Sequence, residues 1–115
     1  MDRDTGGADS AVYDRVFAAL AHPARRQILI TLHFEGGAMG AGEIARMFEH
    51  AWPTTSRHLQ VMVDAGLVTY ERHGRTRTYR VNRPRVDLVA DWLGLIRETG
   101  ASRPTSDDET TRNSP

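Results

Sequence analysis

Residues 52–81 place a short amphipathic helix directly before a β-hairpin, and this order narrows the possible folds more than any other feature. Pro53 suits the start of the helix, because it has a fixed φ and lacks an N–H that the first turn leaves unpaired. Gly66 suits its end as a left-handed cap. Segments 67–70 and 77–81 are rich in Thr, Tyr and Val and flank a glycine-containing turn, which is typical of a hairpin.

Three helices are predicted before this unit and one after it. The first covers about residues 10–20, the second begins near Pro23, and the last begins at Pro84. Residues 34–42 hold four glycines and are expected to form a loop. A short third helix follows this loop, and its expected inward residues are Ile44, Met47 and Phe48.

The third and fourth helices are short and adjacent, as in a helix-turn-helix, and the hairpin after them makes the winged version. The predicted fold is therefore mainly α with a small β-hairpin wing (α+β), in the order α-α-α-α-β-β-α. A length of 115 residues allows one domain, which we place at 10–99. The small, polar segment 1–9 and the tail 100–115, which has no large apolar side chain, are predicted to be disordered.

The formal net charge is zero, but the charges are segregated along the chain. Residues 57–85 carry seven arginines against Asp64 and Glu71, a net charge of +5, between two acidic ends. A basic centre of this kind indicates double-stranded DNA as a partner, although the net charge of the whole chain is zero.

The outward face of the helix at 51–65 carries residue types that read DNA bases. At 100° per residue, Thr54, Arg57 and Gln60 lie opposite the apolar side, and a recognition helix uses mainly its N-terminal half. Arginine suits guanine and glutamine suits adenine, while hydroxyls reach phosphates or bases. An ordinary solvated helix face is the alternative, and for His58 a structural hydrogen-bonding role. The predicted contacts from this helix are Thr54, Thr55, Ser56, Arg57, His58 and Gln60.

The hairpin is expected to contribute Arg75 and Arg77, because guanidinium groups suit phosphates and narrow minor grooves. The alternative is that these charges only protect a strand edge from pairing. Arg25 and Arg26 leave two alternatives open: an ion pair with Glu43 or an N-terminal aspartate, or a phosphate clamp.

The last helix is apolar on two stripes, which indicates burial on more than one side. One stripe suits the core of the protomer, and the other suits the same helix of a second copy; plain packing within a small core is the alternative. Gly94 fits a close helix crossing, and a two-fold dimer matches a palindromic site. Residues 10–99 are thus expected to bind DNA and to dimerise. The predicted interface residues are Val12, Val16, Leu88, Val89, Trp92, Leu95 and Ile96.

Other function classes find no support in the sequence. Without cysteine there is no disulfide, thiolate metal site or cysteine nucleophile. No catalytic arrangement is visible, and the glycines at 36–42 lack the Gly-Lys-Ser/Thr of a P-loop. The five histidines show no ligand spacing, so neither an enzyme, a cofactor nor a metal is predicted. No apolar run suits a membrane span or a secretory signal, so a cytoplasmic protein is expected.

Over about residues 12–97 the chain resembles the ArsR/SmtB family of winged-helix transcriptional repressors. The progression from Pro53-Thr54-Thr55-Ser56-Arg57-His58-Leu59 to Tyr79 is specific to this family, because the spacings between its segments match those of the family over the whole stretch. The resemblance implies a homodimer, formed through the first and last helices, that binds a palindromic operator. The matching segments are 20–29, 42–45, 53–59, 64–68, 74–75 and 79–81.

The chain departs from that family at its metal sites. Many members release DNA when metal or oxidant reaches cysteine or histidine ligands. The Cys-x-Cys of the arsenic and lead sensors falls on Gly40 and Gly42, which offer no ligand. The zinc and nickel site needs Asp-x-His, but Asp87 is followed by Leu88-Val89, and no histidine lies beyond His73. The resemblance therefore implies DNA binding without the family's usual metal ligands.

Three functions stay open at this stage. The first is a dimeric DNA-binding repressor, which the basic wing and the outward Arg57 favour. The second is a sensor of the same fold that responds to a metal or small ligand, with an unknown effector. The third is a winged helix used for protein–protein interaction.

Overall fold

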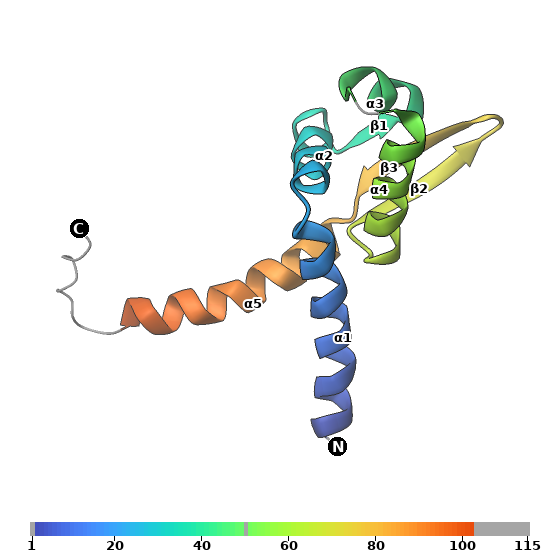
Figure 1. The fold of residues 1–115 in the computed structure, drawn as a ribbon. Coiled ribbons are helices and arrows are strands. Elements are labelled where there is room, and N and C mark those ends of the chain that lie inside the picture. Colours follow the sequence, from blue (N-terminus) through green and yellow to red (C-terminus); the bar gives the residue numbers. More distant parts are fainter. Residues whose placement is uncertain (1, 50, 103–115) are drawn as a thin grey trace.

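The computed structural model describes residues 2–49 and 51–102, with the side chains of 10–49 and 51–97. Helices α2, α3 and α4 pack with a small sheet, while α1 and α5 extend away from this body (Figure 1). The predicted winged helix-turn-helix is confirmed. The elements are α1 (Asp2–Leu20), α2 (Pro23–Phe34), β1 (Ala38–Gly40), α3 (Ala41–Met47), α4 (Trp52–Asp64), β2 (Val68–His73), β3 (Thr76–Val81) and α5 (Arg83–Ser102).

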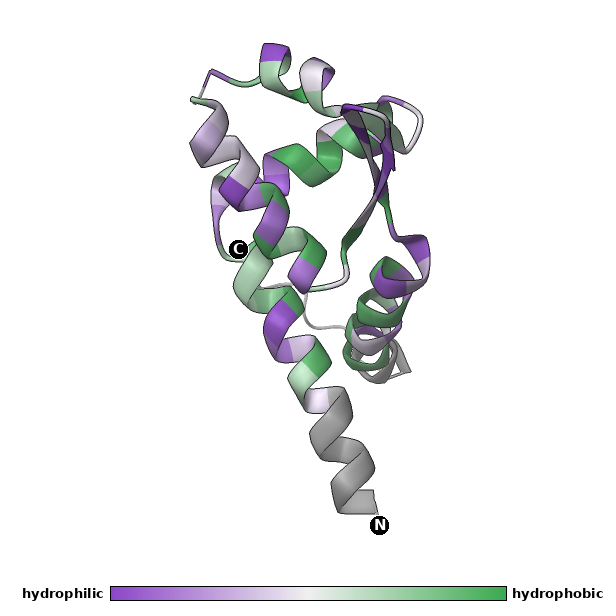
Figure 2. Ribbon diagram, turned by 90° about the vertical axis from the view of Figure 1, so that its right-hand side faces the viewer, coloured by the Kyte–Doolittle hydropathy of each residue, from purple (hydrophilic) through white to green (hydrophobic). Residues whose placement is uncertain are grey.

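The sheet is antiparallel and has the strand order β1-β3-β2. Strands β2 and β3 form the predicted hairpin, in which Tyr70 lies opposite Tyr79 and Arg72 opposite Arg77. Gly74 closes the hairpin with a φ of 64°, in the left-handed region that glycine adopts without steric penalty. The hairpin projects from the body as the wing, and its ribbon is mostly hydrophilic (Figures 1 and 2).

Strand β1 differs from the loop predicted over 34–42. Its residues Ala38–Gly40 pair with β3, so that Met39 lies opposite Tyr79. The partner strand lies far along the chain, and a three-residue strand next to glycines has no alternating pattern of its own. Tertiary pairing, and not local propensity, therefore forms this strand.

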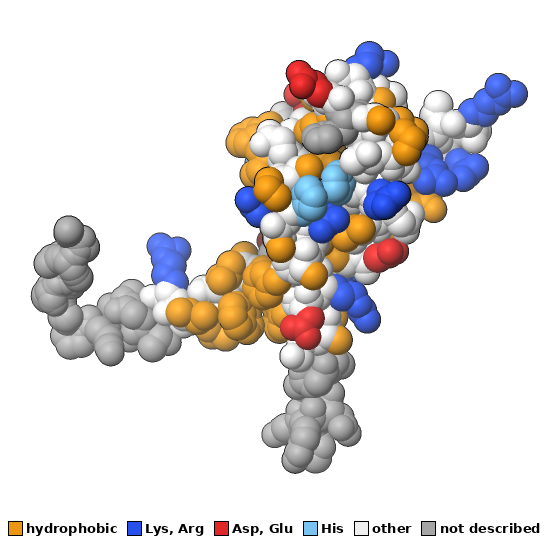
Figure 3. Space-filling view, in the orientation of Figure 1, with side chains coloured by type: hydrophobic (Ala, Val, Ile, Leu, Met, Phe, Trp, Pro, Cys, Tyr) orange, Lys and Arg blue, Asp and Glu red, His pale blue; other side chains and the backbone are white. Residues whose placement is uncertain are grey.

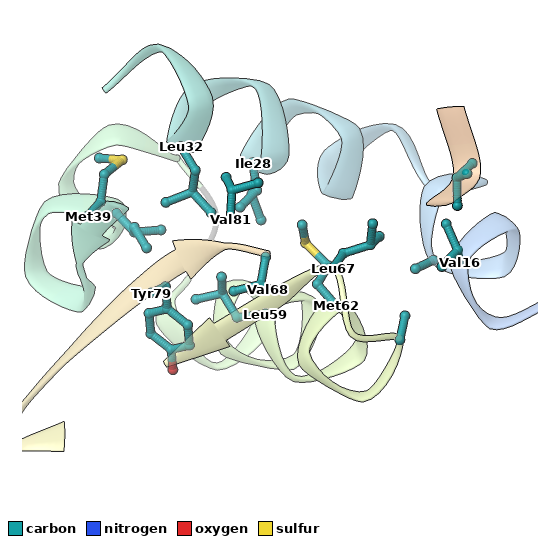
Figure 4. Packing of buried hydrophobic residues seen from close by; sticks show 14 residues of the cluster. Val16, Ile28, Leu32, Met39, Leu59, Met62, Leu67, Val68, Tyr79 and Val81 are labelled. Carbon is teal, nitrogen blue, oxygen red and sulfur yellow. The ribbon is translucent and has the colours of Figure 1, made fainter. Parts of the chain in front are cut away.

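The core lies between α2, α4 and the inner face of the sheet (Figure 4). Ile28 and Leu32 of α2 pack with Leu59 and Met62 of α4 and with Val68 of β2, and all five are at most 2% exposed. Burial of each such side chain contributes roughly 1.5–3 kcal/mol. Because Leu59 and Met62 fix the inner face of α4, the opposite face of that helix is turned outward.

Only some of the apolar side chains of helix α3 and of the residue after it pack against this core. Ile44 is fully buried and Phe48 half-buried, as predicted, but Met47 is 51% exposed. The prediction that Met47 faces inward is therefore wrong. Met47 is the last residue of the helix, and Phe48 directly after it packs against the core instead.

Both terminal helices are longer than predicted. Helix α1 begins at Asp2, within segment 1–9, for which disorder stays a prediction. Helix α5 continues to Ser102, into the segment 100–115, for which disorder stays a prediction. Residue 1 and the remaining tail, 103–115, lie outside the described residues.

Arg25 and Arg26 bind the end of α1, which neither predicted alternative described. Arg25 Nε donates to the Ala19 carbonyl at 2.8 Å, and Arg26 Nη1 donates to the Leu20 carbonyl at 2.7 Å. Carbonyls at a helix C-terminus lack partners within the helix, and cations are favourable there. Glu43, the expected ion-pair partner, accepts instead from a backbone N–H before α3, at 2.9 Å.

The end of α4 is held by residues around the start of α5. Gly66 has a φ of 80°, which confirms the predicted left-handed cap. Asn82 Nδ2 donates to the Gly66 carbonyl at 2.6 Å, and Arg85 Nη1 donates to the Ala65 carbonyl at 2.7 Å. These bonds fix the direction in which α5 leaves the winged helix.

Candidate nucleic-acid interface

The outward face of α4 carries three of the predicted contact residues. Thr54, Arg57 and Gln60 are exposed, and Ser56 is half-buried on the flank of the helix. Gln60 Nε2 donates to Asp64 Oδ1 at 2.9 Å, one turn further along, which holds the amide in place. This face presents one guanidinium, one amide and two hydroxyls toward solvent from a single rigid helix.

Two predicted contact residues of α4 face inward instead. Thr55 is 1% exposed and His58 is 8% exposed, on the side of the helix that also carries Leu59. The His58 ring packs against His22 with 4.5 Å between ring centroids, and Arg25 Nη1 lies 3.5 Å from its Nδ1. The prediction that they contact DNA is therefore corrected, because the helical period turns both toward the protein.

The inner face of the wing carries two aromatic rings and two arginines. Tyr70 and Tyr79 are cross-strand neighbours with 5.7 Å between ring centroids. Arg77 lies over the Tyr70 ring at 4.6 Å, and its Nη1 donates to the Tyr79 hydroxyl at 3.3 Å. The hydrogen bond to Tyr79 raises the pKa of Arg77 above its usual value, so this guanidinium stays charged. Arg77 is thus fixed in orientation, while Arg72 opposite it and Arg75 at the tip are exposed.

A groove of about 460 Å³ separates this face of the wing from α3 and the start of α4. Three guanidiniums, one tyrosine, one serine and one tryptophan face it together with small residues of α3, and no carboxylate lines it. Such a lining suits a polyanion. The lining residues are Ala41, Gly42, Ala45, Trp52, Ser56, Arg72, Arg75, Arg77 and Tyr79.

Trp52, Arg72 and Tyr79 also line this groove, although they are not among the contacts predicted from the sequence. The two-residue period of β strands already places Arg72 on the same face as Tyr70, which was a usable signal. No sequence pattern indicates that Trp52 lines the groove, because its position depends on how α4 begins beside the wing.

Carboxylates are scarce around these arginines. Glu71 pairs with His73 at 3.1 Å, on the opposite face of β2 from Arg72. Arginine side chains gather along the wing and beside α4 in Figure 3, with few acidic groups between them. The positive charge of this region therefore stays available to an external anion.

A second surface lies on α1 and α5, where hydrophobic side chains gather along α5 (Figure 3). Trp92 contacts Tyr13 and Phe17, with ring centroids 5.8 and 5.6 Å apart. Several predicted interface residues lie here, and so do Phe17 and Leu93, which were not predicted. The exposed fractions are 38% for Phe17 and Leu88, 37% for Trp92, 49% for Leu93, 64% for Leu95 and 60% for Ile96.

Two of the predicted interface residues lie in the core of the protomer. Val16 is fully buried and Val89 is 7% exposed, while Val12 is half-buried. The assignment of Val16 and Val89 to an interface is therefore corrected, because each helix uses one stripe for its own core. A β-carbon at Gly94 would meet no atom within 4 Å, which leaves room for close approach of another helix.

Neither a metal cluster nor a membrane span is found in the part of the chain that the structure describes. No three histidine or acidic side chains there lie close enough together to hold a metal ion. None of the described helices is both long and apolar enough to cross a membrane.

Known proteins of similar sequence are transcription regulators. A family model described as a helix-turn-helix domain matches residues 20–71. The transcriptional repressor SdpR of Bacillus subtilis (strain 168) is 34% identical over 80 residues, which are 70% of this chain and 87% of that protein. The arsenical resistance operon repressor of Staphylococcus xylosus is 30% identical over 81 residues, covering 70% of this chain and 76% of that protein.

Solved structures of similar fold agree with these relatives. The crystal structure of an ArsR family transcriptional regulator has a TM-score of 0.71 at 30% identity, over 82% of this chain and 95% of that one. A homodimeric winged helix-turn-helix DNA-binding domain from Mycobacterium bovis, solved in solution, has a TM-score of 0.62 at 28% identity, over 91% of both chains.

Proposed function

The chain belongs to the ArsR family of winged helix-turn-helix transcriptional regulators, and we propose that it is a dimeric repressor that binds a palindromic operator. The family consists of DNA-binding regulators, so the chain is not an enzyme, in agreement with the sequence prediction. Helix α4 enters the major groove, and the wing contacts the adjoining backbone or minor groove.

The observation that carries this proposal is the common lining of one groove by α4 and the wing. Ser56 of α4 lies across from Arg72, Arg75 and Arg77, and no carboxylate lies between them. Arg57 and Gln60 on the exposed side of α4 supply donors that suit guanine and adenine edges. Base contacts from a rigid helix beside guanidiniums that neutralise phosphates are the two components of specific binding.

The dimer follows from the hydrophobic surface of α1 and α5. Leu93 and Ile96 are about half exposed or more on a helix that extends away from the winged body. Exposed apolar side chains in such numbers mark an interaction surface, and a second copy covers them by two-fold symmetry. The homodimeric Mycobacterium bovis neighbour supports this assembly, and a two-fold dimer accounts for a palindromic site.

The proposal carries over the DNA-binding role of the relatives and leaves out their metals. Gly40 and Gly42 stand where thiolate ligands are needed, and the described residues form no three-ligand cluster. The basic groove also disfavours a winged helix used only for protein–protein contact, because such a module needs no row of arginines.

The test is a binding titration with the DNA upstream of the protein's own gene, at two salt concentrations. We expect sequence-selective binding that weakens steeply with salt, because Arg–phosphate contacts release counterions. Scrambled DNA of the same length is the control. Equal binding to both DNAs without salt dependence would contradict the proposal.

A further inference from the structure

Tyr79 places a hydroxyl at the edge of the groove between the wing and α4. Its ring is 3% exposed and packs near Leu59 and Val68, while its oxygen points away from these aliphatic side chains (Figure 4). In the described part of the chain, the hydroxyl makes one hydrogen bond, which it accepts from Arg77 Nη1 at 3.3 Å. A phenol that accepts one bond keeps its own proton to donate. The hydroxyl is therefore fixed and ready to donate into the groove.

Arg72 and Arg77, the two arginines beside this hydroxyl, repel each other. Arg72 lies directly opposite Arg77 in the hairpin, and like charges in directly opposed positions destabilise a sheet. The cation–π contact with Tyr70 holds Arg77 in place without neutralising it. An anion between the two strands' arginines would remove this repulsion.

We propose that this groove binds one phosphate of the DNA backbone, with Arg72 and the Tyr79 hydroxyl as contacts and Arg77 as a positioning residue. The inference rests on the proposed function, since it is α4 in the major groove that would bring a phosphate here. Ser56 of α4 lines the same groove and offers a second hydroxyl. A phosphodiester, with its exposed charged oxygens, accepts from all of these donors at once.

The contact is tested by replacing single phosphates of the operator with neutral methylphosphonates, one symmetric pair at a time. Binding of each DNA is measured for the wild type, for Tyr79→Phe and for Thr78→Val. Both variants lose one hydroxyl and keep the shape of the side chain, so Thr78→Val is a matched control on the opposite face of the same strand. Thermal unfolding of each variant verifies that the fold is retained.

The expected result is a coupling at one position in each half-site. Tyr79→Phe weakens binding to unmodified DNA about tenfold, the effect of one hydrogen bond to a charged group. At the position of the bound phosphate, a methylphosphonate weakens Tyr79→Phe less than it weakens the wild type, because the hydroxyl contact is already lost while Arg72 remains. Thr78→Val responds to it as the wild type does. Arg72→Gln is expected to show its coupling at the same phosphate position. This second variant provides the test if Tyr79→Phe fails to fold.

Other outcomes overturn the inference in distinguishable ways. Specific binding with no phosphate coupled to Tyr79 or Arg72 rejects the clamp and leaves the proposed function standing. Absence of specific DNA binding by the wild type rejects both. Saturable binding of inorganic phosphate that depends on Tyr79, without coupling on DNA, assigns the groove to a free anion and contradicts the DNA contact.

Discussion

The guanidinium of Arg85 lies against Gly66, in the space that a β-carbon at residue 66 would need. From there Arg85 donates to the Ala65 carbonyl at 2.7 Å, so the first turn of α5 holds the last carbonyls of α4. The missing side chain at residue 66 thus serves two purposes. It permits a φ of 80°, and it makes room for the side chain that joins the two helices.

Gly66→Ala is expected to lower the free energy of unfolding by about 2 kcal/mol or more, because a left-handed conformation costs roughly 1–2 kcal/mol for alanine and Arg85 must also move. Gly74→Ala is the matched control, since Gly74 has a φ of 64° but no atom within 4 Å of a β-carbon. Urea unfolding measures both. Equal losses at the two positions would show that displacement of Arg85 contributes nothing.

Arg57→Ala is expected to relax specificity at one base pair of each half-site. A bidentate arginine–guanine contact discriminates against other bases by about 1–3 kcal/mol. Binding to a set of operators with single substitutions measures the change. If the variant keeps the wild-type preference at every position, Arg57 does not read a base.

Arg75→Ala is expected to weaken binding to all DNA sequences similarly and to lower the salt slope by about one unit, as for one lost phosphate contact. Arg80→Ala is the control, because Arg80 lies on the opposite face of β3 from the groove. We expect a smaller change of slope for it. Similar slopes for both variants would show that the wing tip makes no local contact.

Ile96→Glu is expected to dissociate the dimer, because it places a charge in the proposed apolar interface of α5. Ile30→Glu is the control: Ile30 is also half-exposed, at 50% against 60% for Ile96, but it lies on α2. Sedimentation equilibrium measures the mass of each variant. A dimer that survives Ile96→Glu but not Ile30→Glu would move the interface to α2.

The sequence predicts the helix at 51–65, the hairpin and the outward position of Arg57, because helical and strand periods are local properties. It does not predict β1, which forms by pairing with the distant strand β3. It does not predict the groove either, because the groove depends on α3 and the wing meeting in space. Val16 and Val89 show a further limit. A hydrophobic stripe reveals that a face is covered, but it does not reveal whether the protomer or a partner covers it.

The two-residue turn at Gly74 has a consequence for how this wing can change over evolution. Side chains alternate between the faces of a strand, so inserting a single residue into β2 or β3 would move every groove residue beyond it to the opposite face. Arg72, Arg77 and Tyr79 would then no longer share one side. Wings that keep this groove are therefore expected to lengthen or shorten by even numbers of residues, or at the turn itself.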